Sequence, residues 1–407
     1  MFLTERHVIK RNDARFTAID EMALKSKNLY NASLYAVRHH FFLTGKMLSY
    51  NVLQKEFQNA NQIEYRQLPA KVAQAIMQMV ELNFKNFFKA LSRYKVNPKG
   101  FTGQPKLPKY LDKNNGRYLL LFSKQTIFKK DLQKHKLLNL SSLKLSIATS
   151  IKYDNIKQVR IIKKLNNYII EIVYQASFPD TLCDNNRYAA IDLGVNNLAT
   201  VVSNVSGVKP YIISGKKLKS INHKYNKDIA KAKSILELRN NQKTSKCTQK
   251  ITSKRNERIN DYLHKTSRII VNQLLASNIN TLIIGKNKGW KQDINIGASN
   301  NQNFVQIPHS RLIEMLQYKC ALCGINVEIT EESYTSKCSF LDNEKIQKHK
   351  KYVGKRIYRG LFRSSNGILI NADVNGAYNI LRKCKPNAYA NGVMGVVVHP
   401  TIIKIVN

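Results

Sequence analysis

One stretch near the middle of the chain places a carboxylate inside an otherwise apolar run. Residues 188–202 read YAAIDLGVNNLATVV, and Asp192 is the one charged residue among them. The small and β-branched residues predict two buried strands of a hairpin, joined where Gly194 lets another backbone or a phosphate come close. A buried carboxylate is unfavourable unless it is paired or binds a metal ion. The stretch therefore predicts a hairpin built around a functional Asp192.

The charge balance of the chain indicates a polyanionic partner. Lys and Arg total 67 against 26 Asp and Glu, which gives a formal net charge of +41 over 407 residues. This excess is more than solubility requires, and nucleic acid is the partner that it favours. Because 43% of the residues are hydrophobic, a packed core and two or three domains are feasible. A ribosomal-type basic protein is the alternative that charge alone allows.

The sequence shows no sign of a membrane or secretory protein. No run approaches 18 consecutive apolar residues, and the first ten residues lack the apolar segment of a signal peptide. Six Cys without such a signal are typical of reduced thiols rather than of a disulfide framework. We therefore expect no membrane partner and a cytoplasmic, nucleoid-associated location in a bacterium.

The N-terminal part alternates between strand and helix patterns. Apolar residues recur at helical spacing through residues 13–95, for example Val72, Ile76, Val80 and Phe84. Several short strands follow a Pro/Gly-rich break and suggest a small β-barrel. A strand near the N-terminus would join them, which makes the helices an insertion. We expect a barrel of residues 1–12 and 96–180 with a helical insertion of residues 13–95.

Residues 187–407 follow the order of an α/β domain. The 188–202 hairpin and a third strand precede a highly basic helical stretch at residues 216–278. A strand, a helix, another strand and a final helix follow, and this order predicts an RNase H-like fold. Such a fold brings acids from distant strands and helices to one place, where oxygen ligands hold Mg²⁺ or Mn²⁺ for phosphodiester hydrolysis.

Further acids are needed if Asp192 is part of such a site. Asp373 opens the last helix, where it would be either a metal ligand or a helix cap. A third acid is expected from Glu331 or Glu332 at the end of a strand. Strand alternation puts these two on opposite faces, and the sequence does not choose between them. Weaker alternatives are Glu314 and Asp342.

These residues resemble TnpB, the family of RNA-guided nucleases carried by bacterial insertion sequences and related to type V CRISPR effectors. The resemblance rests on the order and spacing of residues 190–200, 264–265, 334–336 and 371–377. It implies a RuvC nuclease domain, a wedge-like barrel with a helical recognition insertion, and a guide RNA derived from the transposon end. It also implies metal-dependent cutting of double-stranded DNA beside a short adjacent motif, with Asp192 and Asp373 as the first and last RuvC acids.

The sequence departs from the family at two places. Gly285 stands where the middle Glu is usual, so either Glu331 or Glu332 replaces that acid, or the protein is a nuclease-inactive RNA-guided repressor. The family's zinc-finger region, residues 337–370, is degenerate. It keeps only Cys338, whereas a structural zinc needs four Cys or His ligands. We therefore expect no structural zinc, and interpret Cys320 and Cys323 as two reduced thiols beside the core.

Basic residues along the chain are candidates for contacts to guide RNA and target DNA, whose sequences would be read by base pairing. A general RNA-binding protein without DNA targeting is a third interpretation. Trp290 and the Asn-rich residues 295–303 are further candidates, and no feature indicates an oligomeric state. The contact candidates are Lys254, Arg255, Arg258, His264, Lys265, Arg268, Lys355 and Arg356.

Overall fold

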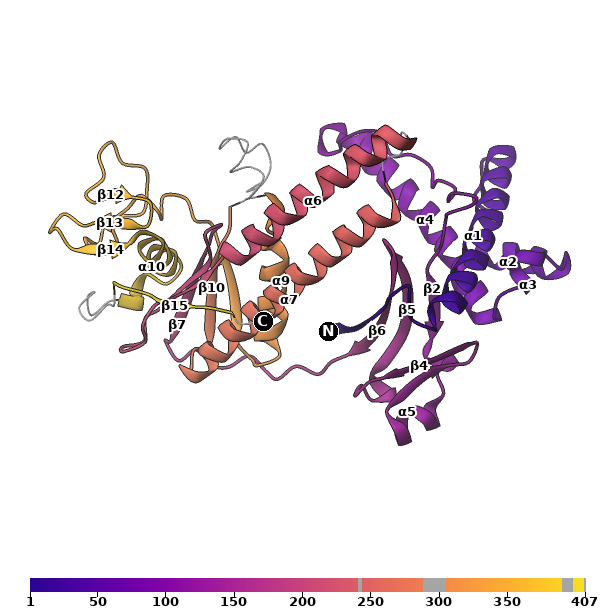
Figure 1. Cartoon of the computed structure of the whole chain (residues 1–407), viewed down its shortest axis with the longest axis horizontal. Coiled ribbons are helices and arrows are strands. Elements are labelled where there is room, and N and C mark those ends of the chain that lie inside the picture. The colour runs from indigo at the N-terminus through magenta and orange to yellow at the C-terminus, as the bar shows by residue number, and fades with distance from the viewer. Residues whose placement is uncertain (241–243, 288–304, 390–397, 406–407) are drawn as a thin grey trace. The chain divides into compact units, whose positions relative to one another are not determined.

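The computed structural model describes residues 1–240, 244–287, 305–389 and 398–405. The chain divides into two compact units, residues 1–177 and 178–407, which Figure 1 shows in indigo to magenta and in magenta to yellow. Each unit has its own sheet and its own hydrophobic core. None of the described helices is both long and apolar enough to cross a membrane.

The first unit contains an antiparallel sheet, and four helices lie between its strands β1 and β2 along the chain. The sheet has the order β1-β6-β5-β2, and β3 and β4 form a separate pair. The strands are β1 (Phe2–Ile9), β2 (Leu120–Ser123), β3 (Leu137–Leu140), β4 (Leu143–Ala148), β5 (Ile156–Lys164) and β6 (Asn167–Gln175). The helices are α1 (Phe16–Thr44), α2 (Tyr50–Asn59), α3 (Ile63–Arg66), α4 (Ala70–Val96) and α5 (Lys129–His135).

The helices of this unit share one core with the sheet. Val72, Ile76, Val80 and Phe84 are fully buried on one face of α4, as their spacing predicts, and belong to the same cluster as Phe122 of β2. Helices α1 to α4 lie between β1 and β2 along the chain, and their role as an insertion in a barrel stays a prediction. The strand pairings among the described residues form an open four-stranded sheet and a hairpin, so the closed barrel stays a prediction.

The second unit contains a six-stranded mixed sheet of the order β11-β10-β7-β8-β9-β15. Strands β7, β8 and β9 form an antiparallel meander, while β10 lies parallel to β7, and β11 to β10. This is the strand order of an RNase H-like α/β domain, the class expected from the sequence. The strands are β7 (Tyr188–Leu193), β8 (Asn197–Ser203), β9 (Tyr211–Ser214), β10 (Thr281–Gly285), β11 (Asn326–Thr330) and β15 (Thr401–Ile403).

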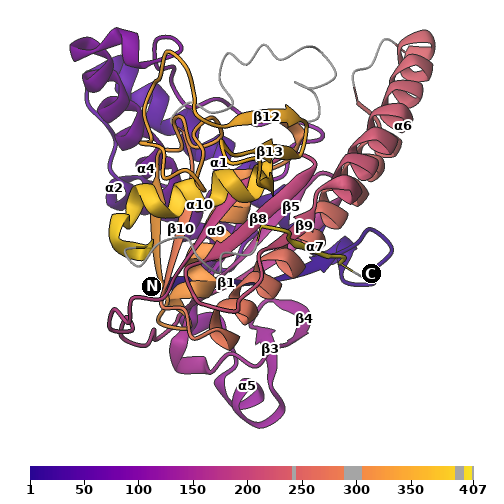
Figure 2. The same cartoon turned by 90° about the vertical axis from the view of Figure 1, so that its left-hand side faces the viewer.

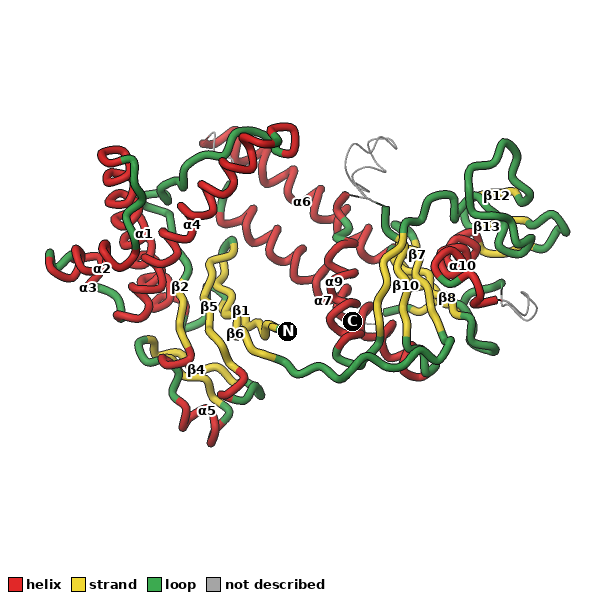
Figure 3. The backbone as a smooth tube through the Cα atoms, turned by 180° about the vertical axis from the view of Figure 1, so that it is seen from behind, coloured by secondary structure: helices red, strands yellow, loops and turns green. Residues whose placement is uncertain are grey.

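Helices cover both faces of this sheet, as Figures 2 and 3 show. Alternate residues of β7 face opposite sides: Ala189 and Ile191 join the core beneath α7 and α9, whereas Ala190 joins the core beneath α10. Helix α6 packs against α7, and these two helices occupy the basic stretch of residues 216–278. The helices are α6 (Lys216–Asn240), α7 (Lys246–Ala276), α9 (His309–Ala321) and α10 (Ala372–Cys384).

The degenerate zinc-finger region forms a small sheet that the sequence does not predict. Strands β12 (Lys355–Tyr358), β13 (Leu361–Arg363) and β14 (Leu369–Asn371) are antiparallel, and β14 leads directly into α10. All four residues of β12 are exposed, so the apolar alternation that marks a strand is missing there. The short elements α5, β3 and β15 are likewise absent from the sequence-based expectation.

Candidate active site

Asp192 occupies the next-to-last position of β7, on the face that α10 covers. Side chains two residues apart on a strand point to the same face, so Asp192 shares the face of Ala190. Ala190 packs into the hydrophobic core between the sheet and α10. A Cβ atom on Gly376 of α10 would lie 2.9 Å from Asp192 Oδ2. Because residue 376 has no side chain, the helix can approach the carboxylate closely. The predicted hairpin and the predicted final helix therefore meet at Asp192.

Asp373 lies in the first turn of α10, but it does not cap the helix. Asn371 is the N-cap residue, and its Oδ1 accepts hydrogen bonds from the backbone N–H groups of Asp373 at 3.0 Å and Val374 at 3.2 Å. The Asp373 carboxylate instead accepts a hydrogen bond from Asn197 Nδ2 at 2.6 Å and lies 3.5 Å from Arg356 Nη2. Its oxygens thus face the end of the β7–β8 hairpin.

Of the two glutamates after β11, the structure brings only Glu332 to the aspartates. Asn287 holds it from both sides: the Glu332 N–H donates to Asn287 Oδ1 at 3.1 Å, and Asn287 Nδ2 donates to Glu332 Oε1 at 3.3 Å. Glu331 is exposed and accepts a hydrogen bond from Ser333 Oγ at 2.7 Å. Strand β11 ends at Thr330, so the Asn287 contact, and not strand alternation, orients Glu332.

Asp192, Glu332 and Asp373 line one cavity of about 1000 Å³ in the second unit. Asn197 and Asn287 are also part of its wall. Basic and hydroxyl side chains also line the cavity, namely Thr335, Ser336, Arg356, Tyr358 and Arg359. Thr335 and Ser336 belong to the 334–336 motif, and Thr335 Oγ1 donates to the Glu332 carbonyl at 2.8 Å. Acidic and basic side chains thus line the same polar cavity.

The electrostatics of this cavity oppose the ionisation of Asp192 and Glu332. Burial raises the pKa of Asp192 well above its usual value, and the negative charges of Glu332 and Asp373 raise it further, while Arg356 lowers it. Burial also raises the pKa of Glu332 to about 6. A bound cation would favour the ionised forms of these carboxylates.

Carboxylate oxygens are the ligands that hard divalent cations prefer, so Asp192, Glu332 and Asp373 are suited to hold such an ion. As the described residues stand, no three His, Cys, Asp or Glu side chains are close enough together to hold a metal ion. Binding an ion would therefore require the three carboxylates to draw closer.

The weaker acidic candidates lie elsewhere. Glu314 is exposed on α9, which packs on the sheet face opposite to α10. Asp342 accepts hydrogen bonds from the Ser365 side chain at 2.6 Å and its N–H at 3.0 Å, within the degenerate zinc-finger region. Neither residue is part of the cavity wall.

Several residues that support the site were not predicted from the sequence. Asn197 and Asn287 fix Asp373 and Glu332, respectively. His309, buried at the start of α9, has its Nε2 2.9 Å from the carbonyl oxygen of Gly194 in the cavity wall. The adjacent Asn196 and Asn197 beside Asp192 were a visible signal, because polar residues at the end of an apolar hairpin often serve a site. Asn287 and His309 carried no such signal.

The predicted nucleic-acid contacts fall into two groups. Lys254, Arg258, His264 and Arg268 are exposed on α7, and Lys265 is ion-paired with Asp261 at 3.1 Å. On β12, Lys355 is exposed while Arg356 reaches the acidic cavity. His264 is not part of the cavity wall, which leaves it away from the proposed metal ligands. Trp290 and residues 295–303 lie outside the described residues.

Arg255 differs from this prediction, because its guanidinium is used inside the protein. Its Nε donates to Asn222 Oδ1 of α6 at 2.9 Å, and its Nη2 donates to the Gln306 carbonyl at 3.0 Å. The guanidinium also lies 5.4 Å from the ring centre of Tyr225. Arg255 therefore holds α6 to α7, and it has few donors left for a phosphate.

The degenerate zinc-finger region is organised by a buried carboxylate. Glu344 accepts hydrogen bonds from the N–H groups of Ser339 at 2.7 Å and Val353 at 3.0 Å. Cys338 is buried, with its Sγ 3.5 Å from the Lys345 carbonyl. These contacts connect the loop before β12, and the expectation that the region binds no structural zinc stays a prediction. Cys320 is buried and Cys323 is partly buried, and neither forms a disulfide bond among the described residues.

Comparisons with known proteins agree with this fold. The family OrfB_IS605, described as a probable transposase, matches residues 171–291, and the Cas12f1-like TNB domain matches residues 309–380. A TnpB-like protein, ORF457 of Acidianus two-tailed virus, is 22% identical, with 88% of this chain and 81% of the viral protein covered. The chain therefore combines an RNase H-like domain with the acidic cavity described above. The matches show that this chain is similar to TnpB-type and Cas12f1-like proteins.

A solved structure supports the same architecture. The cryo-EM structure of a Cas12f1–sgRNA–target DNA complex aligns with a TM-score of 0.53 and 14% sequence identity. The alignment covers 89% of this chain and 82% of the Cas12f1 chain. At this level of identity the likeness concerns the fold.

Proposed function

We propose that this protein is an RNA-guided, divalent-metal-dependent DNA endonuclease encoded by a transposable element, which cuts target DNA beside a short adjacent motif. The observation that carries the proposal is the convergence of Asp192, Glu332 and Asp373, from distant parts of the sequence, on one polar cavity. The family matches and the excess of positive charge support a nucleic-acid substrate. Guide RNA and double-stranded target DNA are the proposed partners.

The side chains of the cavity have distinct roles in this proposal. Asp192, Glu332 and Asp373 hold Mg²⁺ or Mn²⁺. When bound, such ions activate a water molecule and stabilise the leaving oxygen of a phosphodiester. Asn197 orients Asp373, and Asn287 orients Glu332.

Two arginines at this cavity are suited to the substrate backbone. Arg356 and Arg359 are exposed residues of its wall, and their guanidinium groups match a phosphate in shape and charge. Arg356 Nη2 lies 3.5 Å from Asp373 Oδ1, and we expect Arg356 to exchange this acid for the phosphate when DNA binds.

The domain roles follow from the same proposal. Residues 1–12 and 96–180 form the barrel, and residues 13–95 are the helical insertion that recognises the guided duplex. Residues 187–407 form the RuvC nuclease domain, and its helix α7 presents Lys254, Arg258 and Arg268 to the nucleic-acid backbone.

A cleavage assay with reconstituted guide RNA, target DNA and Mg²⁺ tests the proposal. Asp192→Ala and Glu332→Ala are expected to lose nearly all cleavage. Glu331→Ala is the matched control, because the same residue type is removed one position away, from an exposed side chain outside the cavity. Cleavage that survives Asp192→Ala, or that depends on Glu331 and not on Glu332, contradicts the proposed site.

A nuclease-inactive RNA-guided repressor is the second candidate function. Two observations favour it: Gly285 supplies no carboxylate at the end of β10, and the described acids do not form a ready-made metal cluster. Guide-dependent binding of target DNA by the wild-type protein, without cleavage in either Mg²⁺ or Mn²⁺, would select this function. Salt-sensitive binding to any RNA, without guided DNA binding, would instead indicate a general RNA-binding protein.

A further inference from the structure

The turn between β7 and β8 connects two side chains of the acidic cavity. Asp192 lies two residues before Gly194, the first residue of the turn. Asn197 follows the turn and donates from Nδ2 to Asp373 Oδ2 at 2.6 Å. Residues 194–196 between them are part of the cavity wall. A shift of the turn would therefore move Asp192 and the partner of Asp373 together.

The first residue of this turn has no side chain that could fix it by packing. A Cβ atom on Gly194 would lie 2.6 Å from the Asn197 carbonyl oxygen, so a larger residue would displace the turn. The Gly194 N–H donates to the Leu198 carbonyl oxygen over 3.4 Å, which is long for a hydrogen bond. Contacts from outside the hairpin are therefore needed to fix the turn.

Helices α6 and α9 supply such contacts. The Gly215 N–H, directly before α6, donates to the Asn196 carbonyl oxygen at 2.7 Å, and Lys219 Nζ of α6 donates to Asn196 Oδ1 at 2.9 Å. From α9, His309 Nε2 lies 2.9 Å from the Gly194 carbonyl oxygen. A carbonyl oxygen can only accept, so His309 donates this hydrogen bond.

The buried face of α9 brings His309 to the turn. His309 is only 1% exposed, and it begins a buried stripe that continues with Leu312, Leu316 and Lys319 at helical spacing. An apolar residue could fill the same space in the core. It would, however, leave the Gly194 carbonyl oxygen without this donor.

We propose that His309 is a positioning residue of the acidic cavity, because it holds the turn from which Asp192 and Asn197 reach the site. Lys219 acts on the same turn through Asn196. Neither His309 nor Lys219 is part of the cavity wall, and we assign neither a contact to metal ion or substrate. The inference rests on the proposed nuclease function and extends it to α9, on the opposite face of the sheet.

Hydrogen exchange of the intact protein measures the hold on the turn without any cleavage. In His309→Ala the N–H groups of Gly194 and Gly215 should exchange about fivefold faster, which corresponds to the loss of about 1 kcal/mol, as for one neutral hydrogen bond. His309→Gln should restore slow exchange, because Gln Nε2 and His Nε2 are equally many bonds from Cβ. His309→Asn should not, since its amide is one bond shorter.

Cleavage with guide RNA and target DNA at a series of Mg²⁺ concentrations measures the consequence for the site. We expect His309→Ala to need about tenfold more Mg²⁺ for half-maximal cleavage, because residues that orient metal ligands typically contribute 10–100-fold to metal affinity or activity. His309→Gln should need as much Mg²⁺ as the wild type. A general loss of stability would reduce the amount of folded protein without changing the Mg²⁺ requirement.

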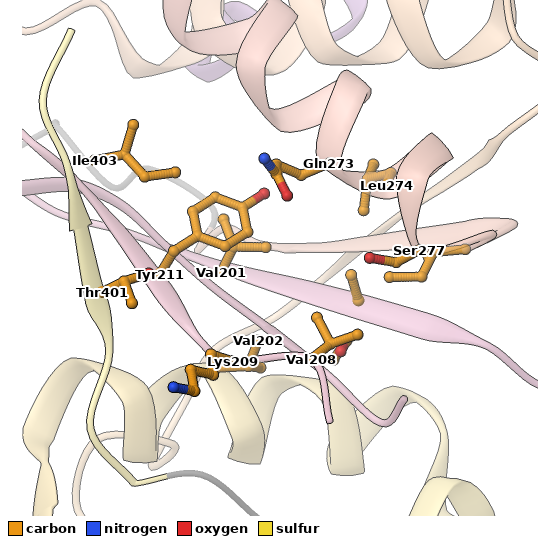
Figure 4. A pocket seen from close by; sticks show the side chains of 13 residues that line it. Val201, Val202, Val208, Lys209, Tyr211, Gln273, Leu274, Ser277, Thr401 and Ile403 are labelled. Carbon is orange, nitrogen blue, oxygen red and sulfur yellow. The ribbon is translucent and has the colours of Figure 1, made fainter. Parts of the chain in front are cut away.

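Lys319→Met is the matched control, from the other end of the same buried stripe. Lys319 Nζ donates to the His264 carbonyl oxygen at 2.8 Å, so it holds α9 to α7 and not to the turn. This variant should melt at a lower temperature, with unchanged exchange at the turn and an unchanged Mg²⁺ requirement. A second control is Gln273→Ala. Figure 4 shows Gln273 at a separate cavity that Ala189 and Ser203 also line, at the ends of β7 and β8 remote from the turn. This variant should leave the melting temperature unchanged as well.

The inference is overturned if His309→Ala leaves the exchange of both N–H groups unchanged, or if His309→Asn exchanges as slowly as His309→Gln. The comparison of the two amide variants decides the question even where His309→Ala does not fold. It is equally overturned if the wild type cleaves and His309→Ala keeps the wild-type Mg²⁺ requirement. A wild type that does not cleave would contradict the nuclease function instead, and hydrogen exchange alone would then decide whether His309 holds the turn.

Discussion

The Glu332 carboxylate lies over Gly285, so that a Cβ atom at residue 285 would come within 2.8 Å of Glu332 Oε2. Gly285 is the last residue of β10, and the parallel strand β11 pairs Thr330 with it. The acid that follows β11 therefore fills the space that a side chain at the end of β10 would otherwise take. Glycine at position 285 and glutamate at position 332 are thus two parts of one arrangement.

Gly285→Ala tests this arrangement. The added methyl group would meet both Glu332 and Ile380, whose Cδ1 atom would be 2.7 Å away, so the carboxylate has to shift. We expect at least a tenfold loss of cleavage, because displacing a catalytic group by about 1 Å costs up to about 10²-fold. Gly103→Ala is the control, since its surroundings are open, and cleavage by it should equal that of the wild type. Undiminished cleavage by Gly285→Ala would contradict a role for Glu332 at this position.

Much of the second unit was predictable because its signals are local. An acid in a β-branched run reveals Asp192, and the succession of apolar strands and helices predicts the RNase H-like order. Asp373 was recognised for its helix start. The choice between Glu331 and Glu332 was not predictable, because it depends on Asn287, which contacts Glu332 across the end of the sheet.

Other features were missed because they depend on three-dimensional contacts. Asn371, rather than Asp373, caps α10, and that distinction requires side-chain geometry. The basic residue Arg255 resembles its exposed neighbours in sequence, but it faces α6.

Metal binding should be visible in the stability of the protein without any cleavage. The pKa of Asp192 is higher in the folded state than in the unfolded chain, where it is near 4. Asp192 therefore lowers the free energy of unfolding at every pH above about 4. In EDTA at pH 7, Asp192→Asn should therefore melt at a higher temperature than the wild type, and the difference should vanish below pH 4. Mg²⁺ should raise the melting temperature of the wild type but hardly that of Asp192→Asn.

A melting temperature of Asp192→Asn that lies below the wild-type value in EDTA would contradict a cost of ionising Asp192 through its burial and its repulsion by Glu332 and Asp373. An equal Mg²⁺-induced shift in both proteins would place the ion elsewhere. Asp342→Asn is a suitable comparison, because Asp342 is held by Ser365 outside the cavity and should leave the Mg²⁺ shift unchanged.

Glu332 should give a pH dependence of its own. Its pKa rises from 4.5 to about 6 on folding, so the folded state binds its proton more tightly, and stability is lost as the pH increases from about 4.5 to 6. Glu332→Gln keeps an acceptor for Asn287 and avoids this loss, which corresponds to about 2 kcal/mol above pH 6. Chemical denaturation at pH 4.5 and pH 7 in EDTA measures the difference. Glu331→Gln, an exposed neighbour, should show a much smaller change between the two pH values.

Two arginines three residues apart on α7 should separate a structural role from a binding role. Arg255→Ala removes the contacts to Asn222, Gln306 and Tyr225, and we expect it to destabilise the protein by about 2 kcal/mol. Arg258 is exposed, so Arg258→Ala should change stability by less than about 0.5 kcal/mol. It should instead weaken RNA binding. The slope of the logarithm of the affinity against the logarithm of the salt concentration should fall by about the amount of one phosphate contact.

Thermal unfolding and RNA titrations at several salt concentrations distinguish these outcomes. The two substitutions remove the same side chain from one helix, so each serves as the control for the other. If Arg255→Ala left the melting temperature unchanged but weakened RNA binding, its guanidinium would contact phosphate rather than α6. If Arg258→Ala left RNA binding unchanged at every salt concentration, the exposed face of α7 at this position would not contact the nucleic-acid backbone.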